Sequence, residues 1–432
     1  MSDWQQISLG DLETPVRRRV AIPPQGSRDS MSDGYPLRSL GEVMRLDIQR
    51  TPMKPATTYR LAGVLNAGKG VVDKGELDGG DTEYAAMNVL HVDQVVMRKL
   101  TAWEGPITVV PAEFDGFVVS NEFPTFTLGP ELLPAWMRHV CGSPRLWAEM
   151  KNRVIGTVQR RKRLNPEQLL QIQLPIPPRE VQTRIVEVLG AVDDQIAALE
   201  SETNAARGIL NLVLKEHFAA AEGEPHRIVD LCSHVVGGVW GKPEGEGEVN
   251  RLALGPRIYA SGTSDFVTDG SPVRSFTTKQ ADTRTVREED IILERSGGSP
   301  EQPVGRVAIA GPGLEPCVPT DFQRLMRVDP EKAHPRYVFW RLRHDWASGL
   351  TNNYSRRTTG ITNLSVKDYI AREVTVPSLE EQAGLVERGE AVDALLVALR
   401  AETAGLRQVR AGLLSALLDR TIEIEPAELL EV

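Results

Sequence analysis

The feature that most constrains the fold of this chain is an internal repeat with a spacing of 200 residues. Residues 174–207 and 374–407 align without a gap. Two unrelated amphipathic helices could share apolar positions, but they would not share a proline, a glutamine and the spacing between them. The repeat therefore indicates a tandem duplication of one structural unit. Identical pairs include Pro177 and Pro377, Glu180 and Glu380, Gln182 and Gln382, and Asp193 and Asp393.

Each copy continues as a long amphipathic segment. Apolar residues recur at alternating spacings of four and three, which is the period of a coiled-coil seam. No proline occurs from residue 179 to 224 or from 378 to 425, so we expect spacer helices over residues 178–222 and 378–422. Because helices gain most of their stability by burying an apolar face, the two should pair with each other. The seam positions are Ile185, Leu189, Val192, Ile196, Leu199, Leu210, Leu385, Val392, Leu396, Leu399, Leu406 and Leu413.

Residues 36–177 and 223–377 differ from the helical segments. They are rich in glycine and proline, and they carry short β-type runs flanked by turn residues. Each also contains a helix that a proline opens, at residues 134–140 and 335–342. Each segment has the length of an ordinary domain. We therefore expect two mixed α/β globules.

The expected fold class is α+β, with two globules separated and joined by two long helices that form an antiparallel coiled coil with pseudo-twofold duplication. Shorter similarities also link the globules: residues 59–61 with 257–259, 120–123 with 320–322, and 163–165 with 363–365. The expected domains are an N-terminal extension (1–35), globule 1 (36–177), spacer helix 1 (178–222), globule 2 (223–377), spacer helix 2 (378–422) and a tail (423–432).

Composition limits the class of protein. The chain has 432 residues, no apolar run long enough to span a membrane, and a net charge of −9. Residues 178–224 carry −5 and residues 378–432 carry −6, so the rest of the chain sums to +2. The overall acidity therefore does not argue against nucleic-acid binding by the globules. Three separated cysteines and seven histidines without ligand spacing predict no disulfide framework and no metal site, and they fit the cytoplasm.

The duplication, the helix entries at 174–182 and 374–382, and the two seam helices resemble the DNA-specificity (S) subunit of type I restriction–modification enzymes. Residues 305–308 and 360–364 also resemble patterns of that family. The resemblance implies two target-recognition domains that each read half of a bipartite double-stranded DNA target, with the helix pair setting the spacer. It also implies a non-catalytic subunit that docks two methyltransferase subunits and often two restriction–translocation subunits. S-adenosylmethionine, ATP and magnesium would then bind to those partners and not to this chain.

Basic residues in loops are the candidates for DNA contact. Residues 151–163 contain six basic residues and no acid, and an Arg pair lies in the corresponding region of the second globule. Two basic loops at equivalent places of a duplicated chain suit phosphate contacts. Residues 63–70 nearly spell a phosphate-binding loop, but Gly70 stands where that motif needs Ser or Thr. The candidates are Lys69, Lys74, Arg98, Lys99, Arg160, Arg161, Lys162, Arg163, Arg295, Arg306, Arg356 and Arg357.

Other functions stay open from the sequence. The same architecture could serve a different phage-defence assembly, which a neighbouring gene other than a methyltransferase would favour. A structural coiled-coil protein without a DNA role is a third possibility, and it predicts no DNA retention at low salt. No nucleophile elbow and no adenine-methyltransferase tetrapeptide is found, so an enzymatic activity on this chain is the least favoured.

Overall fold

The computed structural model describes residues 35–156, 162–259, 264–266, 268–298, 302–357 and 361–422. The chain divides into two units, residues 1–185 with 415–432, and residues 186–414. The extension and the tail expected at the two ends lie outside the described residues, apart from Tyr35.

The described part of the first unit is built around two sheets. One is four-stranded in the order β2-β10-β7-β8, and its strands are antiparallel neighbours. The neighbouring strands β7 and β8 are fully buried, which matches their continuous apolar sequence. The bounds are β2 Met44–Leu46, β7 Val95–Met97, β8 Ile107–Val109 and β10 Thr125–Leu128.

The second sheet of this unit is five-stranded, in the order β3-β6-β9-β4-β5. Its longest element is the β4–β5 hairpin, in which residue 64 pairs with residue 71. Only the β4–β9 pair is parallel. The bounds are β3 Gln49–Pro52, β4 Thr58–Val64, β5 Val71–Asp78, β6 Ala86–Val89 and β9 Val118–Val119.

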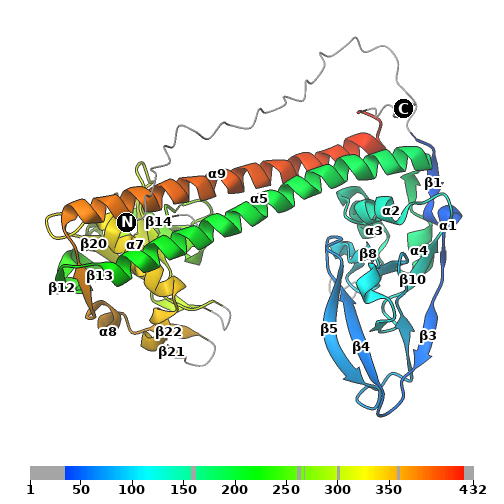
Figure 1. Ribbon diagram of the computed structural model, residues 1–432, viewed down its shortest axis with the longest axis horizontal. Coiled ribbons are helices and arrows are strands. Elements are labelled where there is room, and N and C mark those ends of the chain that lie inside the picture. The colour runs from blue at the N-terminus through cyan, green and yellow to red at the C-terminus, as the bar shows by residue number, and fades with distance from the viewer. Residues whose placement is uncertain are drawn as a thin grey trace, which may run out of the picture. The chain divides into compact units, whose positions relative to one another are not determined.

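Helices close one side of the first globule (Figure 1). The helix expected at 134–140 is α2 (Pro134–Cys141), and its Trp136 and Met137 are fully buried. The two-stranded pair β1–β11 brings the start of the globule to its end, next to the long helix. The other elements are β1 Leu37–Ser39, α1 Leu40–Val43, η1 Ala102–Glu104, η2 Ala112–Phe114, α3 Pro144–Arg153, α4 Pro166–Leu170 and β11 Gln173–Pro175.

The described part of the second unit repeats this plan. Its four-stranded sheet has the order β13-β20-β16-β18, and a three-stranded sheet β15-β14-β19 again contains one parallel pair, β14–β19. A third sheet has the order β17-β22-β21, and β12–β23 is the counterpart of β1–β11. The bounds are β12 Glu224–Arg227, β13 Cys232–Gly237, β14 Val249–Leu254, β15 Val273–Phe276, β16 Ile291–Glu294, β17 Ser296–Gly297, β18 Val307–Ile309, β19 Cys317–Pro319, β20 Gln323–Val328, β21 Ser355–Arg357, β22 Thr362–Leu364 and β23 Glu373–Val376.

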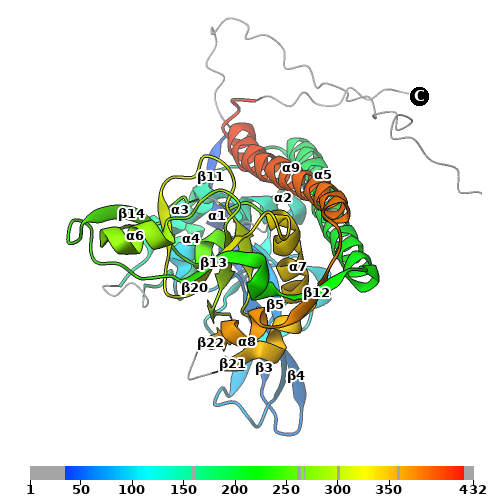
Figure 2. The same cartoon turned by 90° about the vertical axis from the view of Figure 1, so that its left-hand side faces the viewer.

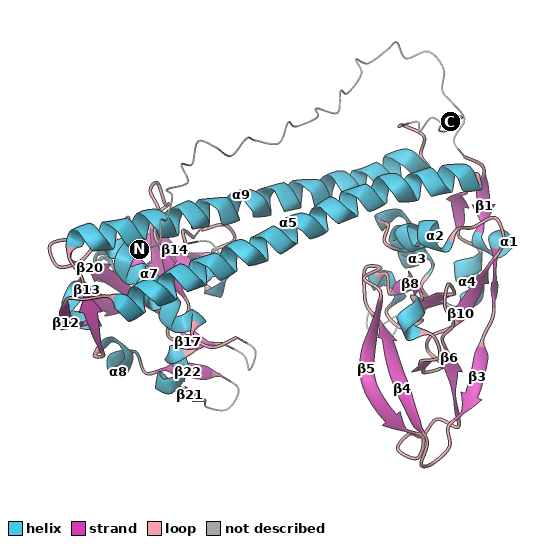
Figure 3. Ribbon diagram, viewed as in Figure 1, coloured by secondary structure: helices cyan, strands magenta, loops and turns pink. Residues whose placement is uncertain are grey.

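The helix expected at 335–342 is longer than predicted and forms α7 (Pro335–Ala347). Its Tyr337, Phe339 and Trp340 are buried in the core, as is usual for an aromatic cluster on a helix. The remaining elements are η4 Ile228–Leu231, η5 Pro256–Tyr259, α6 Thr278–Arg284, η6 Leu350–Tyr354 and α8 Val366–Ile370. Figure 3 shows this mixture of helix and strand.

The repeat extends into the topology of the globules, because both share the same four-strand order and the same parallel pair. The similarity of residues 120–123 to 320–322 corresponds to equivalent turns. The similarity of residues 59–61 to 257–259 does not hold: the first lies in β4, whereas the second lies in η5. The true counterpart of β4 is β14, since each pairs in parallel with the equivalent strand.

The two long helices are α5 (Arg179–Ala220) and α9 (Leu379–Leu418), within two to four residues of the expected ends. Within residues 186–414 they lie side by side and antiparallel (Figures 1 and 2). Their ion pairs show the direction, because Asp193 meets Arg410 and Glu200 meets Arg407. The antiparallel helix pair is therefore confirmed.

The seam positions differ in burial. Ile185, Leu189, Ile196, Leu199, Leu210, Leu385, Leu396 and Leu399 are buried, whereas Val192, Val392, Leu406 and Leu413 are half-buried. Leu210 and Leu385 also belong to the core of the second globule. The helix pair and that globule therefore share one hydrophobic core.

Candidate nucleic-acid interface

Lys99 and Arg295 occupy equivalent places in the two globules. The Lys99 amide donates to the Glu122 carbonyl at 2.9 Å, and its own carbonyl accepts from the Leu164 amide at 3.1 Å. The Arg295 amide likewise donates to Phe322 at 2.7 Å, and its carbonyl accepts from Leu364 at 2.8 Å. The same backbone frame therefore presents one half-exposed cation in each globule.

In the second globule, Arg295 directly precedes strand β17, which belongs to the three-stranded sheet β17-β22-β21. Arg356 lies opposite Asn363 and Arg357 lies opposite Thr362, and both arginines are exposed. Because successive side chains of a strand point to opposite faces, the two guanidinium groups leave β21 on opposite sides. Only one of them can lie on the same face as a given neighbour on β22.

Arg324 is a basic residue that the sequence analysis missed. Burial and then the nearby charge of Arg295 lower the pKa of the Arg324 guanidinium. Two cations thus lie close together where the inner strands β16 and β20 of the four-stranded sheet meet the turn at 320–322. The only sequence signal for Arg324 is its place on a strand next to the turn at 320–322, which does not reveal its neighbour.

In the first globule the corresponding region contains two isolated β-bridges and, among its described residues, no three-stranded sheet. Arg163 bridges to Leu100 and to Ile155, and its exposed side chain meets Glu122 at 3.1 Å. The half-buried Lys162 accepts, through its carbonyl, a bond from the Thr101 amide at 2.9 Å. The remaining candidates of this loop, Arg160 and Arg161, lie outside the described residues.

Lys69 and Lys74 lie in the β4–β5 hairpin, and both are exposed. Gly68 has a positive φ of 62°, and a Cβ there would lie 2.6 Å from the Cys141 carbonyl oxygen. The turn is therefore held against the end of α2 and needs glycine. A strand, β5, follows Gly70 where a phosphate-binding loop would need a helix.

Arg98 has a structural role. Its guanidinium donates to Asn66 Oδ1 at 2.8 Å, to Thr101 Oγ1 at 2.7 Å and to the Leu100 carbonyl at 3.0 Å, and it meets Glu104 at 3.3 Å. These bonds use its Nε and Nη2 donors within the globule. DNA contact by Arg98 stays a prediction.

Arg306 is also held internally. It forms a bidentate pair with Glu294 at 2.6 and 2.9 Å, and the Glu294 side chain is 1% exposed. A guanidinium that neutralises a buried carboxylate cannot leave it without a large cost. Arg306 is therefore a structural residue of the second globule.

Gln182 and Gln382 are functional positions whose role the sequence did not reveal. Gln182 Oε1 accepts from the Leu133 amide at 2.8 Å, and Gln382 Oε1 accepts from the His334 amide at 2.8 Å. Leu133 and His334 are the N-cap residues of α2 and α7. Both glutamines are buried, and each Nε2 donates to the preceding proline carbonyl at 2.8 Å. The repeated glutamine thus attaches each globule to the start of its long helix.

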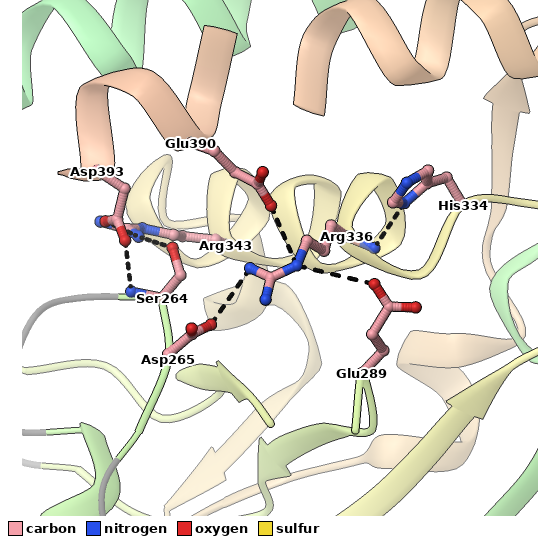
Figure 4. Close-up of polar contacts among 8 residues, drawn as sticks. All are labelled: Ser264, Asp265, Glu289, His334, Arg336, Arg343, Glu390 and Asp393. Carbon is pink, nitrogen blue, oxygen red and sulfur yellow. Dashed lines mark hydrogen bonds and ion pairs between the residues drawn. The ribbon is translucent and has the colours of Figure 1, made fainter. Parts of the chain in front are cut away.

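Ion pairs add a second attachment between α7 and α9 (Figure 4). Arg336 lies among three carboxylates: Glu390 of α9 at 3.0 Å, Asp265 at 3.2 Å and Glu289 at 3.8 Å. One turn further along α9, Asp393 meets Arg343 of α7 at 3.4 Å. Side chains of α7 therefore join the helix pair to the loops of the second globule.

A buried carboxylate ties α7 to α8. Asp345 is 1% exposed and accepts from the Tyr369 hydroxyl at 3.0 Å, and it pairs with Arg341 and Arg372. Burial raises the pKa of Asp345, and the two arginines oppose that rise. Both arginines pair with the carboxylate, although Nε of each has no hydrogen-bond partner, and the cluster positions these helices.

Reactive groups are scarce in the described part of the chain. Burial raises the pKa of Cys141, Cys232 and Cys317 to about 12, so these thiols are poor nucleophiles. No group of His, Cys, Asp and Glu among the described residues could hold a metal ion. Among the described helices, none is long and apolar enough to cross a membrane.

No protein-family model matches the chain, and no curated protein matches it in sequence. Solved structures do match. A chain from the structural study of the assembly and conformational transition of the type I R-M system covers 91% of this chain with 100% of its own length, at 19% identity and a TM-score of 0.59. The HsdS subunit from Thermoanaerobacter tengcongensis aligns 97% of its own length with 90% of this chain, at 19% identity and a TM-score of 0.42. The S subunit of a type I restriction–modification system from M. genitalium aligns 99% of its own length with 92% of this chain, at 13% identity and a TM-score of 0.49.

The first of these matches covers nearly the whole chain, with both globules and both long helices, at a TM-score above 0.5. At 19% identity it establishes the architecture. The resemblance found in the sequence is thereby confirmed at the level of the fold: the chain shares its fold with a chain of a type I R-M system.

Proposed function

We propose that this chain is the DNA-specificity subunit of a type I restriction–modification enzyme. The observation that carries the proposal is the duplicated unit: each globule is attached to its long helix by an equivalent buried glutamine and presents an equivalent cation, Lys99 or Arg295. A duplicated reader of this kind suits a target made of two half-sites. The shared fold supports the same function.

The helix pair sets the distance between the two half-sites. A stiff helical spacer holds two readers at a defined separation, which a flexible linker cannot do. In this proposal the chain does no chemistry itself. Two methyltransferase subunits modify adenine at N6, with two restriction–translocation subunits alongside, in the cytoplasm. S-adenosylmethionine, ATP and magnesium bind to those partner subunits.

The direct test is to express the chain with its cognate methyltransferase subunit in a host that lacks other adenine methylation. We expect new N6-methyladenine at a two-part, asymmetric motif, detected by methylation-sensitive sequencing. Absence of any new motif, with both proteins folded and copurifying, would overturn the proposal. Retention of DNA without methylation would instead favour a different defence assembly, and no DNA retention at low salt would favour a purely structural role.

Single-residue effects on DNA affinity follow from the same proposal. Lys99→Ala, Arg295→Ala and Arg357→Ala should each weaken binding and reduce the slope of log K against log salt by about 1 if each cation meets one phosphate. Lys215→Ala, which removes an exposed cation from α5, is the control and should leave the slope unchanged. Fluorescence anisotropy with a methylation-motif duplex across a salt series measures these slopes. A slope equal to wild type in all three variants would exclude these residues as phosphate contacts.

A further inference from the structure

Trp240 and Phe322 are exposed aromatic residues whose rings meet on the surface of the second globule. Trp240 is 48% exposed and Phe322 is 36% exposed. The ring centroids lie 6.2 Å apart and the planes are at 83°, so the edge of one ring faces the other. A single exposed apolar residue is ordinary, but two adjoining rings leave a larger apolar surface in water. This aromatic pair suits an apolar group of a partner.

The backbone holds the aromatic pair in place. Trp240 lies in the loop after β13, and Phe322 lies in the turn between β19 and β20. The Gly238 amide donates to the Gln323 carbonyl at 3.1 Å. A Cβ at Gly238 would lie 1.9 Å from the Thr320 carbonyl oxygen, so the loop packs on the turn as closely as only glycine allows. The two rings are therefore preorganised for a contact.

Two arginines lie against the aromatic pair. The guanidinium carbon of Arg274 lies 5.3 Å from the centre of the Trp240 ring. The Arg295 amide donates to the Phe322 carbonyl at 2.7 Å, so this candidate phosphate contact starts at the turn that carries the aromatic ring. An apolar contact and a cation are thus presented together on one surface.

The charge around the aromatic pair is mainly positive. Lys242 is exposed on the loop after β13, and the half-buried Arg324 follows the turn. Burial and then Arg295 lower the pKa of the Arg324 guanidinium, and Asp321 opposes that fall. Among the described residues 237–242 and 320–324, Asp321 is the acid. Four cations against one acid favour a polyanion such as DNA over an acid-poor protein surface.

The first globule differs at the equivalent place. There the Lys99 amide donates to the Glu122 carbonyl at 2.9 Å. Glu122 therefore stands where Phe322 stands in the second globule, and its carboxylate pairs with Arg163 at 3.1 Å. The first globule has an ion pair where the second has an aromatic ring, so the two globules present different chemistry to what they bind.

We propose that Trp240 and Phe322 contact bases in the half-site that the second globule reads. This inference rests on the proposed function and names specificity-determining residues for it. The surrounding cations hold the phosphate backbone, which positions the globule without reading sequence. The rings then cover an apolar part of the bases, such as a thymine methyl group, or wedge into a base step. The aromatic pair therefore adds sequence discrimination at one half-site.

The test measures the Kd of the chain, in complex with its cognate methyltransferase subunit, for the methylation-motif duplex and for duplexes with either half-site scrambled. Trp240→Ala should reduce the discrimination against the scrambled duplex by about tenfold at one half-site and leave it unchanged at the other. Phe322→Ala should act at the same half-site, whereas Trp240→Phe, which keeps a ring, should retain most of the discrimination. The slope of log K against log salt should equal that of wild type, because no cation is removed.

Tyr84→Ala is the matched control, because Tyr84 is a 45% exposed aromatic residue of the first globule. It should leave discrimination at that half-site unchanged, and a wild-type Tm in each variant verifies that the chain is folded. Wild-type discrimination in both alanine variants would overturn the inference. So would loss of copurification with the methyltransferase subunit at unchanged discrimination, which would make the aromatic pair a protein-docking surface. A wild type that does not prefer its motif over either scrambled duplex would instead contradict the proposed function itself.

Discussion

Replacing Leu199 or Leu399 by aspartate is expected to lower the free energy of unfolding by at least about 3 kcal/mol per site. Each side chain is 5% exposed in the seam between α5 and α9. The substitution removes buried apolar surface and leaves a carboxylate without a partner in the seam. Chemical denaturation followed by circular dichroism measures the loss. The same variants, expressed with the methyltransferase subunit, should lose methylation of the bipartite motif.

The controls for this prediction lie on the same helices. Leu212 of α5 is 53% exposed and Leu395 of α9 is 44% exposed, so aspartate at these positions buries no charge. We expect these variants to stay within about 0.5 kcal/mol of wild type. Equal losses at the seam and control positions would show that α5 and α9 do not form a paired seam.

Gln182→Ala and Gln382→Ala are expected to cost about 2 kcal/mol each, because truncation leaves buried backbone groups without partners. The affected groups are the Leu133 and His334 amides and the carbonyls of Pro177 and Pro377. The two amides belong to the N-cap residues of α2 and α7, so the loss should loosen the junction of each globule with its long helix.

Hydrogen exchange gives this prediction a local readout. In Gln182→Ala the Leu133 amide should lose protection while the His334 amide keeps it, and Gln382→Ala should show the reverse. Gln195→Ala, an exposed position of α5, is the matched control and should change neither amide. Unchanged protection in both variants would show that the repeated glutamine does not attach the globules.

The helices were predictable because their information is local. The four-and-three spacing of apolar residues and the absence of proline place α5 and α9 within a few residues of the expected ends. The pairing of the helices also follows, since neither apolar face can be buried by its own helix. The strands β7, β8, β16 and β18 were equally visible as short apolar runs between turn residues.

The roles of individual polar residues were not predictable, because they depend on partners far away in the sequence. Arg98 and Arg306 look like loop cations in the sequence, yet each is bonded inside its globule. The likeness of residues 59–61 to 257–259 was misleading for the same reason: a strand needs a neighbouring strand, and residues 257–259 form a 3-10 turn instead.

The sequence by itself determined the duplication, the two long helices, their seam and the alternation of helix with globule, because hydrophobic period and repeat spacing are local properties of a chain. The tertiary structure alone decided what the repeated glutamine holds and which arginines are bonded inside their globules. A glutamine shows its role only when a helix cap lies beside it. Likewise, Arg98 and Arg306 show their internal bonds only when Glu104 and Glu294 lie beside them.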